Sequence, residues 1–570
     1  MATQGSSGRS LESRWVGGLP LVNSVLSRLR IDDLLKRALP SSNRRARIPP
    51  AQALGVLLRN LILNRRCPLY TFSDWARLAE PALVGLDDGG GEALNDDRLG
   101  RALDALFDAD RASLMTEIVV RAVREFEIDL SQIHNDSTTL TLQGRYENAD
   151  GRTMRGKPTL SITHGHNKDH RPDLKQLLLV LTISADGAIP VHFRSMDGNT
   201  SDDRTHVDTW DAIRRLAGRA DFLYVADCKL CTQEAMTHID AHGGRFITIL
   251  PRTRREDRWF REHLLGQTPP WEEIARPENP RRKPGTKDVW KVVESPLPSK
   301  EGYRIVWVWN SLKMERDAAT RQETIEKAWL ELEQLQTKLQ SPRSRMRELA
   351  KVAVAVERVL AHRQACRFLT ATVEETDDPV YRQEKRGRPG EKTRYIRKKR
   401  RRFSITTRLN QEAIDADAKS DGMFPLITNV RDLPAGKILD AYKYQPRLEK
   451  RHEQWKSVEG LAPAWLKSVA RLEAMLFLYF IALLVQSLLE REVRRNMTEQ
   501  GIDELPLYPE ERACKAPTTE RILDLFEPLQ RHRLYENERL RETFEPELSA
   551  IHRQILRLMR ISPAAFESVV

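Results

Sequence analysis

Cysteine is scarce in this sequence: there are five cysteines in 570 residues, an odd number scattered along the chain. Proteins stabilised by disulfides are usually short secreted chains with paired cysteines, so this usage excludes a disulfide framework and indicates a reducing compartment. Cys228 and Cys231 form a lone Cys-x-x-Cys pair, and no second pair follows at zinc-ligand spacing. A zinc or redox site there is therefore the less favoured interpretation.

Long hydrophobic runs are absent as well. The most apolar stretch, residues 474–485, contains 12 residues before Gln486. A transmembrane helix needs roughly 20, so we predict a buried core helix at 470–492 instead. The N-terminal residues also lack the apolar segment of a signal peptide. We therefore expect a cytoplasmic protein with no membrane partner.

Basic residues are in excess. The formal net charge is +12, the pI is near 9.4, and charged residues make up 31% of the chain. This balance favours a polyanionic partner, most simply nucleic acid, with a soluble basic enzyme as the alternative. The excess is densest at residues 382–402, which hold 12 Lys or Arg against two Glu. That segment is either a solvated linker or part of a surface for the same partner.

The chain is long enough for several domains. Residues 1–128 have a helical pattern: Pro49 and Pro50 suit a first helical turn, and apolar residues then recur with the helical period. Further helices are expected at 70–79 and 96–126. This region is either a helical DNA-binding domain or a bundle that only packs on the rest of the chain.

Residues 129–250 are expected to form a mixed sheet flanked by helices, because short β-rich runs alternate with helical segments. Asp186-Gly187 suits a hairpin turn between the first two strands. The expected strands are 177–183, 189–193, 222–226 and 245–250, and the expected helices are 204–218 and 232–242.

Residues 251–418 interrupt this pattern as a large α+β insertion. The core pattern resumes over 419–495, and residues 496–570 are expected to be a helical tail. The insertion contains strand-like runs at 288–293 and 303–309, a charged helical hairpin over 311–362, and the basic segment. In the later regions we expect a strand at 422–429 and helices around Glu449, at 470–492, at 517–530 and at 536–560.

Three isolated acidic residues carry the clearest chemical signal. Asp136 and Asp227 come at expected strand ends, and Glu449 lies on an expected helix. Carboxylate oxygens are ligands that Mg²⁺ prefers, and paired Mg²⁺ ions suit in-line attack on a phosphodiester. The sequence therefore predicts a metal site for DNA chemistry, with Glu453 as a fallback ligand for Glu449.

The residues around Glu449 support this prediction. Tyr442, Gln445 and Lys456 fall on the same helical stripe as the glutamate, so donors and a cation would flank a carboxylate. A merely solvated charged face is the alternative. Pro446 favours a helix start near Gln445, which would leave Tyr442 on a preceding turn.

Together these motifs resemble those of bacterial insertion-sequence transposases with an Asp-Asp-Glu (DDE) catalytic core. The Tyr-Arg-Glu-Lys signature of that family reads Tyr442, Gln445, Glu449 and Lys456 in this sequence. Asp136 in Asn-Asp-Ser-Thr and Asp227 in Val-Ala-Asp are similar to the two aspartate motifs. Segments 165–176, 197–202 and 459–467 also look like the family. The resemblance covers 129–250 and 420–495 well, and the N-terminal region more weakly.

The resemblance implies an α/β fold with an RNase H-like mixed sheet flanked by helices, an N-terminal helical domain, and a large α+β insertion before the glutamate. It implies that Asp136, Asp227 and Glu449 are catalytic and hold two Mg²⁺ ions, for which Mn²⁺ can substitute. Such a site cleaves DNA at transposon ends and joins the freed 3′-hydroxyl to target DNA. The arginine of the signature is replaced by Gln445, which removes one phosphate-facing cation.

Other side chains are expected to contact DNA. Trp307 shares a strand face with Trp309, where it would either stack on an unpaired base or fill a small core beneath a hairpin. His164, His166 and His170 with two nearby aspartates, Asp169 and Asp173, look like a metal cluster, but a polar loop is the favoured interpretation. The full set of expected DNA contacts is Lys456, Tyr442, Gln445, Lys168, Arg171, Lys175, Trp307, Arg400 and Arg401.

Three functions are consistent with these features. The first is a DDE transposase that binds its terminal repeats and target DNA, as a homodimer when it pairs two ends. The second is a nuclease with the same core that never joins DNA, and the third is a catalytically inactive DNA-binding protein. For the first we expect a bacterial, nucleoid-associated protein.

Overall fold

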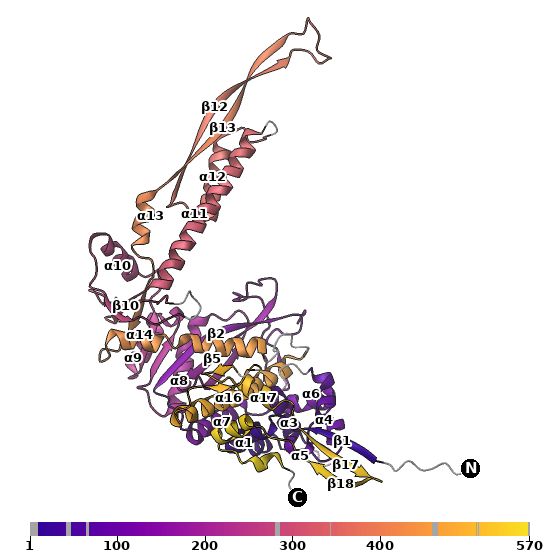
Figure 1. Ribbon diagram of the computed structural model, residues 1–570. Helices are drawn as coiled ribbons and strands as arrows, with labels where there is room; N and C mark the ends of the chain where they lie inside the picture. Colours follow the sequence, from indigo (N-terminus) through magenta and orange to yellow (C-terminus); the bar gives the residue numbers. More distant parts are fainter. Residues whose placement is uncertain are drawn as a thin grey trace. The chain divides into compact units, whose positions relative to one another are not determined.

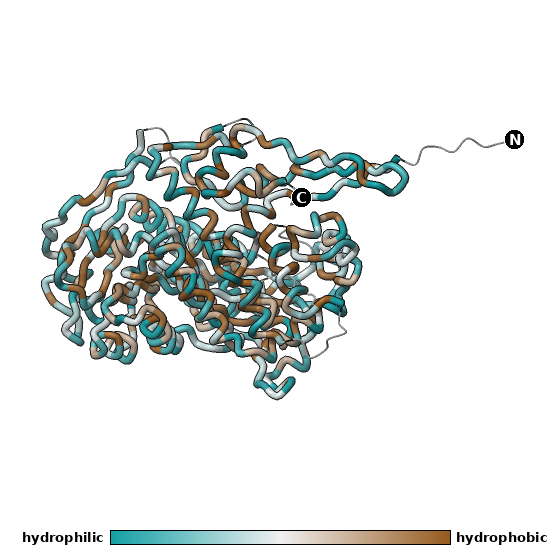
Figure 2. The backbone as a smooth tube through the Cα atoms, turned by 90° about the horizontal axis from the view of Figure 1, so that it is seen from below, coloured by the Kyte–Doolittle hydropathy of each residue, from teal (hydrophilic) through white to brown (hydrophobic). Residues whose placement is uncertain are grey.

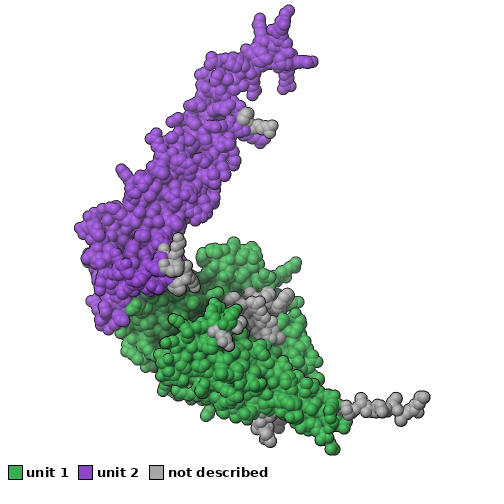
Figure 3. Space-filling view, viewed as in Figure 1, with its two compact units in different colours: residues 1–248, 440–570 green, residues 249–439 purple. Residues whose placement is uncertain are grey.

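A computed structural model describes residues 9–40, 47–63, 68–279, 285–341, 344–458, 466–508, 510 and 512–567. The chain forms two compact units (Figure 3). Unit 1 comprises Met1–Thr248 and Asp440–Val570, and unit 2 comprises Ile249–Leu439. Unit 2 thus contains the expected insertion.

Unit 1 contains a mixed sheet whose strands run in the order β6-β5-β2-β7-β8. The first three pair antiparallel, and β7 and β8 run parallel to β2. This confirms the strands expected in 129–250, and the Asp186-Gly187 hairpin. Gly187 has a φ of 78°, the left-handed conformation that glycine adopts most readily. The strands are β2 Gln132–Leu142, β5 Lys175–Ser184, β6 Pro190–Met196, β7 Leu223–Ala226 and β8 Arg245–Ile249, and the intervening helices are α8 His206–Ala217 and α9 Gln233–Ala241.

A long helix, α16 (Val469–Glu499), is the centre of the helical part of unit 1. It passes the length and hydropathy test for a membrane span, but 94% of its most apolar window is buried inside the protein. It packs against α1, α3, α6, α17, α18 and β6 (Figure 1). The prediction of a buried core helix is therefore confirmed.

The N-terminal helices α1, α3 and α6 pack on α16, which is consistent with both interpretations of residues 1–128. The segment 96–126, expected as one helix, forms two helices. The second begins after Asp110, whose side chain caps it by accepting a hydrogen bond from the Ser113 amide. The helices are α1 Leu19–Leu29, α2 Ile31–Ala38, α3 Pro50–Leu63, α4 Phe72–Leu78, α5 Pro81–Val84, α6 Asp96–Asp108 and α7 Arg111–Glu125.

The prediction of a wholly helical tail is wrong. Strands β17 (Gln530–Glu536) and β18 (Arg539–Phe544) form a hairpin, and β17 also pairs with β1 (Arg9–Trp15) at the other end of the chain. Asn537 and Glu538 both have positive φ, which suits a two-residue hairpin turn. The hairpin and β1 are largely polar (Figure 2). Among the described residues of the tail, α17 (Thr519–Phe526), α18 (Ala550–Leu558), the end of α16 and a 3-10 turn at Pro563–Phe566 are helical. Short strand pairs form at β3 Thr153–Met154 with β4 Lys157–Pro158 and at β15 Leu505–Pro506 with β16 Ala513–Cys514.

Unit 2 confirms the strands and the helical hairpin expected of the insertion. Its sheet has the order β14-β11-β10-β9, with antiparallel neighbours. The basic segment, however, is no linker: it lies in a long antiparallel ribbon made by β12 and β13. The elements are α10 Arg255–Gly266, β9 Glu272–Ala275, β10 Trp290–Glu294, β11 Arg304–Asn310, α11 Ser311–Gln340, α12 Leu349–His362, β12 Leu369–Gln383, β13 Tyr395–Leu409, α13 Gln411–Ala418 and β14 Met423–Thr428. Two helices, α14 (Ala435–Tyr442) and α15 (Gln445–Glu453), lead back to α16.

Candidate active site

Asp136 and Asp227 lie on neighbouring strands in unit 1. The expectation of a strand end is confirmed for Asp227, which directly follows β7, but is wrong for Asp136, because β2 continues to Leu142 through its pairing with β5. The parallel register of β2 and β7 pairs Asn135 with Ala226, so the next residue on each strand is one of the two aspartates. Asp227 directly follows β7, where its side chain accepts a hydrogen bond from the Lys229 amide at 3.0 Å and caps a short helical turn. The sheet register therefore brings together two carboxylates that are far apart in the sequence.

The charge state of Asp136 reflects this crowding. Burial raises the pKa of the Asp136 carboxyl from its ordinary 3.8 to about 7, Lys168 opposes the rise, and the negative charges of Asp227 and Asp202 add to it. Lys168 Nζ lies 3.8 Å from Asp136 Oδ1 and 3.3 Å from Asp202 Oδ2. It also donates to the Ser137 carbonyl at 2.6 Å. One ammonium group is thus shared between two carboxylates of the site.

Helix α15, which carries Glu449, is fixed to β2 through Gln445. The Gln445 Nε2 donates to the Asn135 carbonyl at 3.2 Å, and its Oε1 lies 2.8 Å from His134 Nδ1. Burial lowers the pKa of His134 to about 4, so the ring is neutral at pH 7 and its Nδ1 donates to the amide oxygen. Glu449 lies one helical turn beyond Gln445, on the same face, and is exposed.

A second anchor fixes the other side of α15. The buried Arg451 donates to the carbonyls of Ala188 and Gly187, in the hairpin turn between β5 and β6. It also forms a buried ion pair with Glu490 of α16. The guanidinium has a fourth partner in Gln454, whose Oε1 lies 2.7 Å from its Nη1. Together with the two partners of Gln445 on β2, these contacts fix the position of α15.

The pKa of Tyr442 indicates that the charges of all three predicted acids act on its phenol. Burial raises the pKa of its phenol, and the negative charges of Asp227, Cys228, Glu449 and Asp136 act in the same direction. Tyr442 ends α14, and α15 begins at Gln445 with Pro446 in its first turn, as the sequence predicts. Tyr442 and Glu449 are therefore on successive helices rather than on one continuous stripe.

The donor set partly fits a divalent metal. Asp136 and Asp227 are adjacent carboxylates whose mutual repulsion a cation would relieve, and Glu449 is exposed on α15, which Gln445 anchors to β2. Within the described ranges, however, no three side chains of Asp, Glu, His or Cys converge closely enough to form a complete metal site. The two aspartates are the assembled part of the site, and Glu449 is its nearby but separate third member.

Several of the cations expected to contact phosphate are paired inside unit 1. Lys456, in the π-helical turn Gln454–Val458, lies 2.9 Å from Asp169 Oδ1. Arg171 lies 2.7 Å from Asp173 on the exposed loop. Lys175 donates to the Arg145 carbonyl at 2.7 Å. Of these cations, Lys168 contacts the acidic group directly through Asp136, and Lys456 is held by Asp169 of the adjoining loop.

Trp307 contradicts one expectation. Its side chain is only 1% exposed and stacks on Phe260 with 4.0 Å between ring centroids, so it belongs to the core of unit 2 and not to a surface for bases. Gln445 likewise is buried and uses its amide inside the protein, which leaves it no group for DNA. Arg401 is exposed but lies 3.1 Å from Glu375 on the neighbouring strand, and Arg400 is also on β13.

The weaker metal interpretations find no support among the described residues. No cluster forms at His164, His166 and His170, since Asp169 pairs with Lys456 and Asp173 with Arg171. Cys228 and Cys231 are free thiols. Glu453 is exposed at the end of α15. Part of the family-like segment 459–467, residues 459–465, lies outside the described residues.

Two members of the site were not assigned individually from the sequence. Asp202, in the turn before α8, shares Lys168 with Asp136. His452 Nδ1 lies 3.8 Å from Asp136 Oδ2, and its Nε2 has no hydrogen-bond partner. Burial lowers the pKa of His452 to about 3, so the ring is neutral. Helical spacing could have found His452, which follows Glu449 by three residues and shares its face.

Comparison with known proteins gives limited information. Residues 11–120 match a family described as a domain of unknown function (DUF4277), a stretch well short of half the chain. No curated protein matches the sequence. Among solved structures, the chain is similar to piggyBac transposase in the cryo-EM structure of its synaptic complex with hairpin DNA, with 8% identity, coverage of 90% of this chain and 78% of that chain, and a TM-score of 0.36. A TM-score this low does not establish a shared fold, so the function has to be inferred from the site itself.

Proposed function

We propose that the chain is a DDE transposase that cleaves DNA at transposon ends and joins the freed ends to target DNA. The observation that supports this proposal is the adjacency of Asp136 on β2 and Asp227 directly after β7. Glu449 lies on α15, which Gln445 anchors to β2, and its charge acts on the same Tyr442 phenol as the charges of the two aspartates. The mixed sheet beneath them supports an RNase H-like core.

In this proposal Asp136, Asp227 and Glu449 hold Mg²⁺, or Mn²⁺ in its place. A divalent metal at that position supplies charge neutralisation at the scissile phosphate and lowers the pKa of the attacking hydroxyl or water. Asp136 supports this role because burial, and to a lesser extent the charge of Asp227, raises the pKa of its carboxyl, so a cation beside it would favour the charged form. Glu449 is exposed and would complete the ligand set from the face opposite the strands.

The chain's own cations would position the DNA. Lys168 lies beside Asp136, and Lys168 and Lys456 are each held by an aspartate, so a phosphate would compete with Asp202 and Asp169 for them. Arg171 and Lys175 would contact phosphates further along the same loop. Pairing of two transposon ends would require a homodimer, and such a protein would act on the bacterial nucleoid.

Cleavage of terminal-repeat DNA tests the proposal. The DNA flanking the gene would be incubated with Mg²⁺ and either wild type, Asp227→Asn or Asp221→Asn. Asp221 is an exposed carboxylate on the loop before the same strand, paired with Arg219 at 2.6 Å, and its substitution is the matched control. We expect cleavage by wild type and the control, and a loss of at least 100-fold in Asp227→Asn with DNA binding intact.

The alternatives give different results in the same assay. Cleavage without joining of pre-cleaved ends to a plasmid would identify a nuclease. DNA binding without cleavage by wild type, with verified ends and either Mg²⁺ or Mn²⁺, would leave a catalytically inactive DNA-binding protein. Equal cleavage by wild type and Asp227→Asn would show that this site is not the catalytic one.

A further inference from the structure

The ribbon of β12 and β13 in unit 2 has two parts with different electrostatic character. Fifteen residue pairs connect Leu369–Leu409 to Gln383–Tyr395, a length of about 46 Å at 3.3 Å per residue. We define the ribbon stem as residues 369–379 with 399–409, and the ribbon tip as residues 380–398. In Figure 1 the tip continues beyond the end of the helical hairpin α11–α12.

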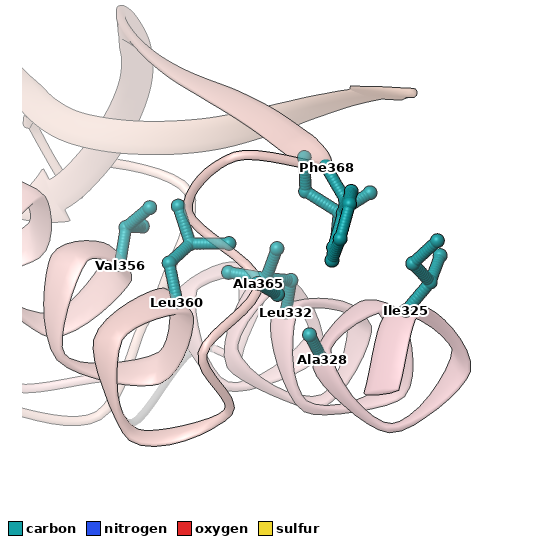
Figure 4. Packing of buried hydrophobic residues seen from close by; sticks show 8 residues of the cluster. Ile325, Ala328, Leu332, Val356, Leu360, Ala365 and Phe368 are labelled. Atoms are coloured by element: carbon teal, nitrogen blue, oxygen red, sulfur yellow. The ribbon is translucent and has the colours of Figure 1, made fainter. Parts of the chain in front are cut away.

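The ribbon stem is part of a hydrophobic core. Leu369 and Phe368 pack with residues of α11 and α12, and Figure 4 shows this cluster around Ala328 and Leu332. Phe403 is the most distal buried residue of the ribbon and packs on the far end of the same helices. Beyond it, the helices give the ribbon no apolar support.

The cations of the ribbon stem are neutralised across the strands. Lys399 lies 3.0 Å from Asp377, Arg401 lies 3.1 Å from Glu375, and Arg402 lies 2.6 Å from Asp378. Exposed pairs of this kind contribute little to stability. The stem as a whole holds five Lys or Arg against four Asp or Glu, so its net charge is only +1.

The ribbon tip has no such compensation. It holds eight Lys or Arg against two Glu, all of these charged side chains are exposed, and within the described residues none of the eight cations has an ion-pair partner. A two-stranded ribbon is only marginally stable by itself in water, and eight like charges at its end repel one another. The eight are Arg382, Lys385, Arg386, Arg388, Lys392, Arg394, Arg397 and Lys398.

The cross-strand register places cations on both faces of the ribbon tip. Arg397 is opposite Tyr381 on one face, and Arg382 is opposite Ile396 on the other. Two tyrosines on the first face, Tyr381 and Tyr395, are 64% and 53% exposed. An acidic patch on a protein would meet one face only, whereas a groove between two phosphate chains meets both.

We propose that the ribbon tip is a DNA-binding element that inserts between the phosphate chains of duplex DNA, independently of the catalytic site. The major groove of B-DNA is about 12 Å wide and accepts a two-stranded β-ribbon. Cations on both faces would contact the two walls, largely without regard to sequence. This inference gives the proposed transposase a second DNA contact, in unit 2, and it corrects the expected contacts Arg400 and Arg401 to residues further along the ribbon.

The salt dependence of binding tests this element. Each phosphate neutralised by a side chain contributes about 0.9 to the slope of log affinity against log salt. If all eight cations contact phosphates, the tip alone contributes a slope of about 7, and removal of three lowers the slope by about 3. The test variant is Arg382→Gln, Arg394→Gln and Arg397→Gln, which removes cations from both faces without touching the core.

A matched control removes three exposed cations from α11 and α12 of the same unit, as Lys327→Gln, Lys351→Gln and Arg358→Gln. Binding to a 30-base-pair duplex of arbitrary sequence would be measured at several salt concentrations in EDTA, so that cleavage plays no part. We expect the slope to fall by about 3 in the tip variant and by less than 1 in the control. Unchanged thermal unfolding of both variants would verify the fold.

Three results would overturn the inference. The first is an equal fall of the salt slope in both variants, and the second is no fall of the slope in the tip variant. The third is tighter binding of the whole protein, through the ribbon tip, to single-stranded RNA or polyglutamate than to duplex DNA. Failure of the proposed catalytic function is a separate outcome. If wild type cleaves DNA but the tip variant has an unchanged salt slope, only this inference is refuted. If the tip variant has a lower salt slope but wild type does not cleave DNA, only the proposed activity is refuted.

Discussion

Replacing Asp136 by asparagine should make the metal-free protein more stable at neutral pH, although it removes a residue that we assign to the active site. The folded protein keeps the Asp136 carboxyl protonated up to about pH 7, because burial raises its pKa from 3.8. The unfolded chain releases that proton near pH 3.8. Since the folded state binds the proton more tightly, the free energy of unfolding of wild type falls as the pH rises between these values and levels off above pH 7.

The size of this effect follows from the pKa shift. A shift of about three units corresponds to about 4 kcal/mol at 1.36 kcal/mol per unit. The Asp136 side chain keeps 20% of its exposure, so solvent screening makes this an upper limit, and we expect about 2 to 4 kcal/mol. Asparagine has the same shape and no titration, so its advantage over wild type should be small at pH 4 and reach its full size at pH 8.

Scanning calorimetry in EDTA at pH 4, 5, 6, 7 and 8 would measure this difference. A chain of two units need not unfold in one transition, so the shift should appear in the transition of unit 1 only. Asp221→Asn is the control: a hydrogen bond from Arg219 lowers the pKa of Asp221, so its stabilising effect is lost only as the pH falls below 3.8 and should not vary from pH 5 to 8. Parallel pH profiles for wild type and Asp136→Asn would refute the inferred crowding of carboxylates.

Two further substitutions test the anchors of α15. Gln445→Ala leaves His134 Nδ1 without its partner. It should lower the cleavage rate by about 100-fold, because a displacement of about 1 Å in a catalytic group has that effect. An unchanged DNA affinity would identify Gln445 as a positioning residue, and an unchanged cleavage rate would refute its role as an anchor of α15. Arg451→Met removes one of the two arginines that pair with the buried Glu490 and leaves Arg494 at 3.1 Å from its carboxylate. Loss of a hydrogen bond to a charged group should reduce the free energy of unfolding by about 1.5 to 3 kcal/mol. Denaturant unfolding at pH 7 measures this, and a loss below about 1 kcal/mol would show that Glu490 finds water or another partner.

The parts of the fold that depend on local pattern could be predicted from the sequence. The strands of unit 1 are continuous apolar runs, and Pro446 fixed the start of α15 at Gln445 because proline is tolerated in a first turn. Asp227 could be placed at a strand end for the same reason, whereas Asp136 lies inside β2, because the polar residues that follow it continue the strand. Their adjacency, however, depends on the pairing of β2 with β7, which the resemblance implied and local pattern does not contain.

The parts that local pattern could not predict depend on pairing between distant segments or on polar burial. The charged sequence of the hairpin β17–β18 suggests a helix. Its strand structure depends on pairing with β1, which lies at the opposite end of the chain. The ribbon was hidden because its strands are rich in Lys and Arg, residues that are depleted in strands. Gln445 was expected to face DNA because polar side chains are usually exposed, yet it is buried against His134.

We propose that Asp136, Asp227 and Glu449 surround one metal position, and iron-directed cleavage of the chain would map that position. Fe²⁺ would replace Mg²⁺ in the free protein, and ascorbate with hydrogen peroxide would generate hydroxyl radicals that cut the backbone beside the bound ion. We expect cuts close to residues 136, 227 and 449, suppressed by excess Mg²⁺ and lost in Asp227→Asn. Cuts confined to other segments, such as 164–173, or a pattern unchanged by Asp227→Asn, would contradict it.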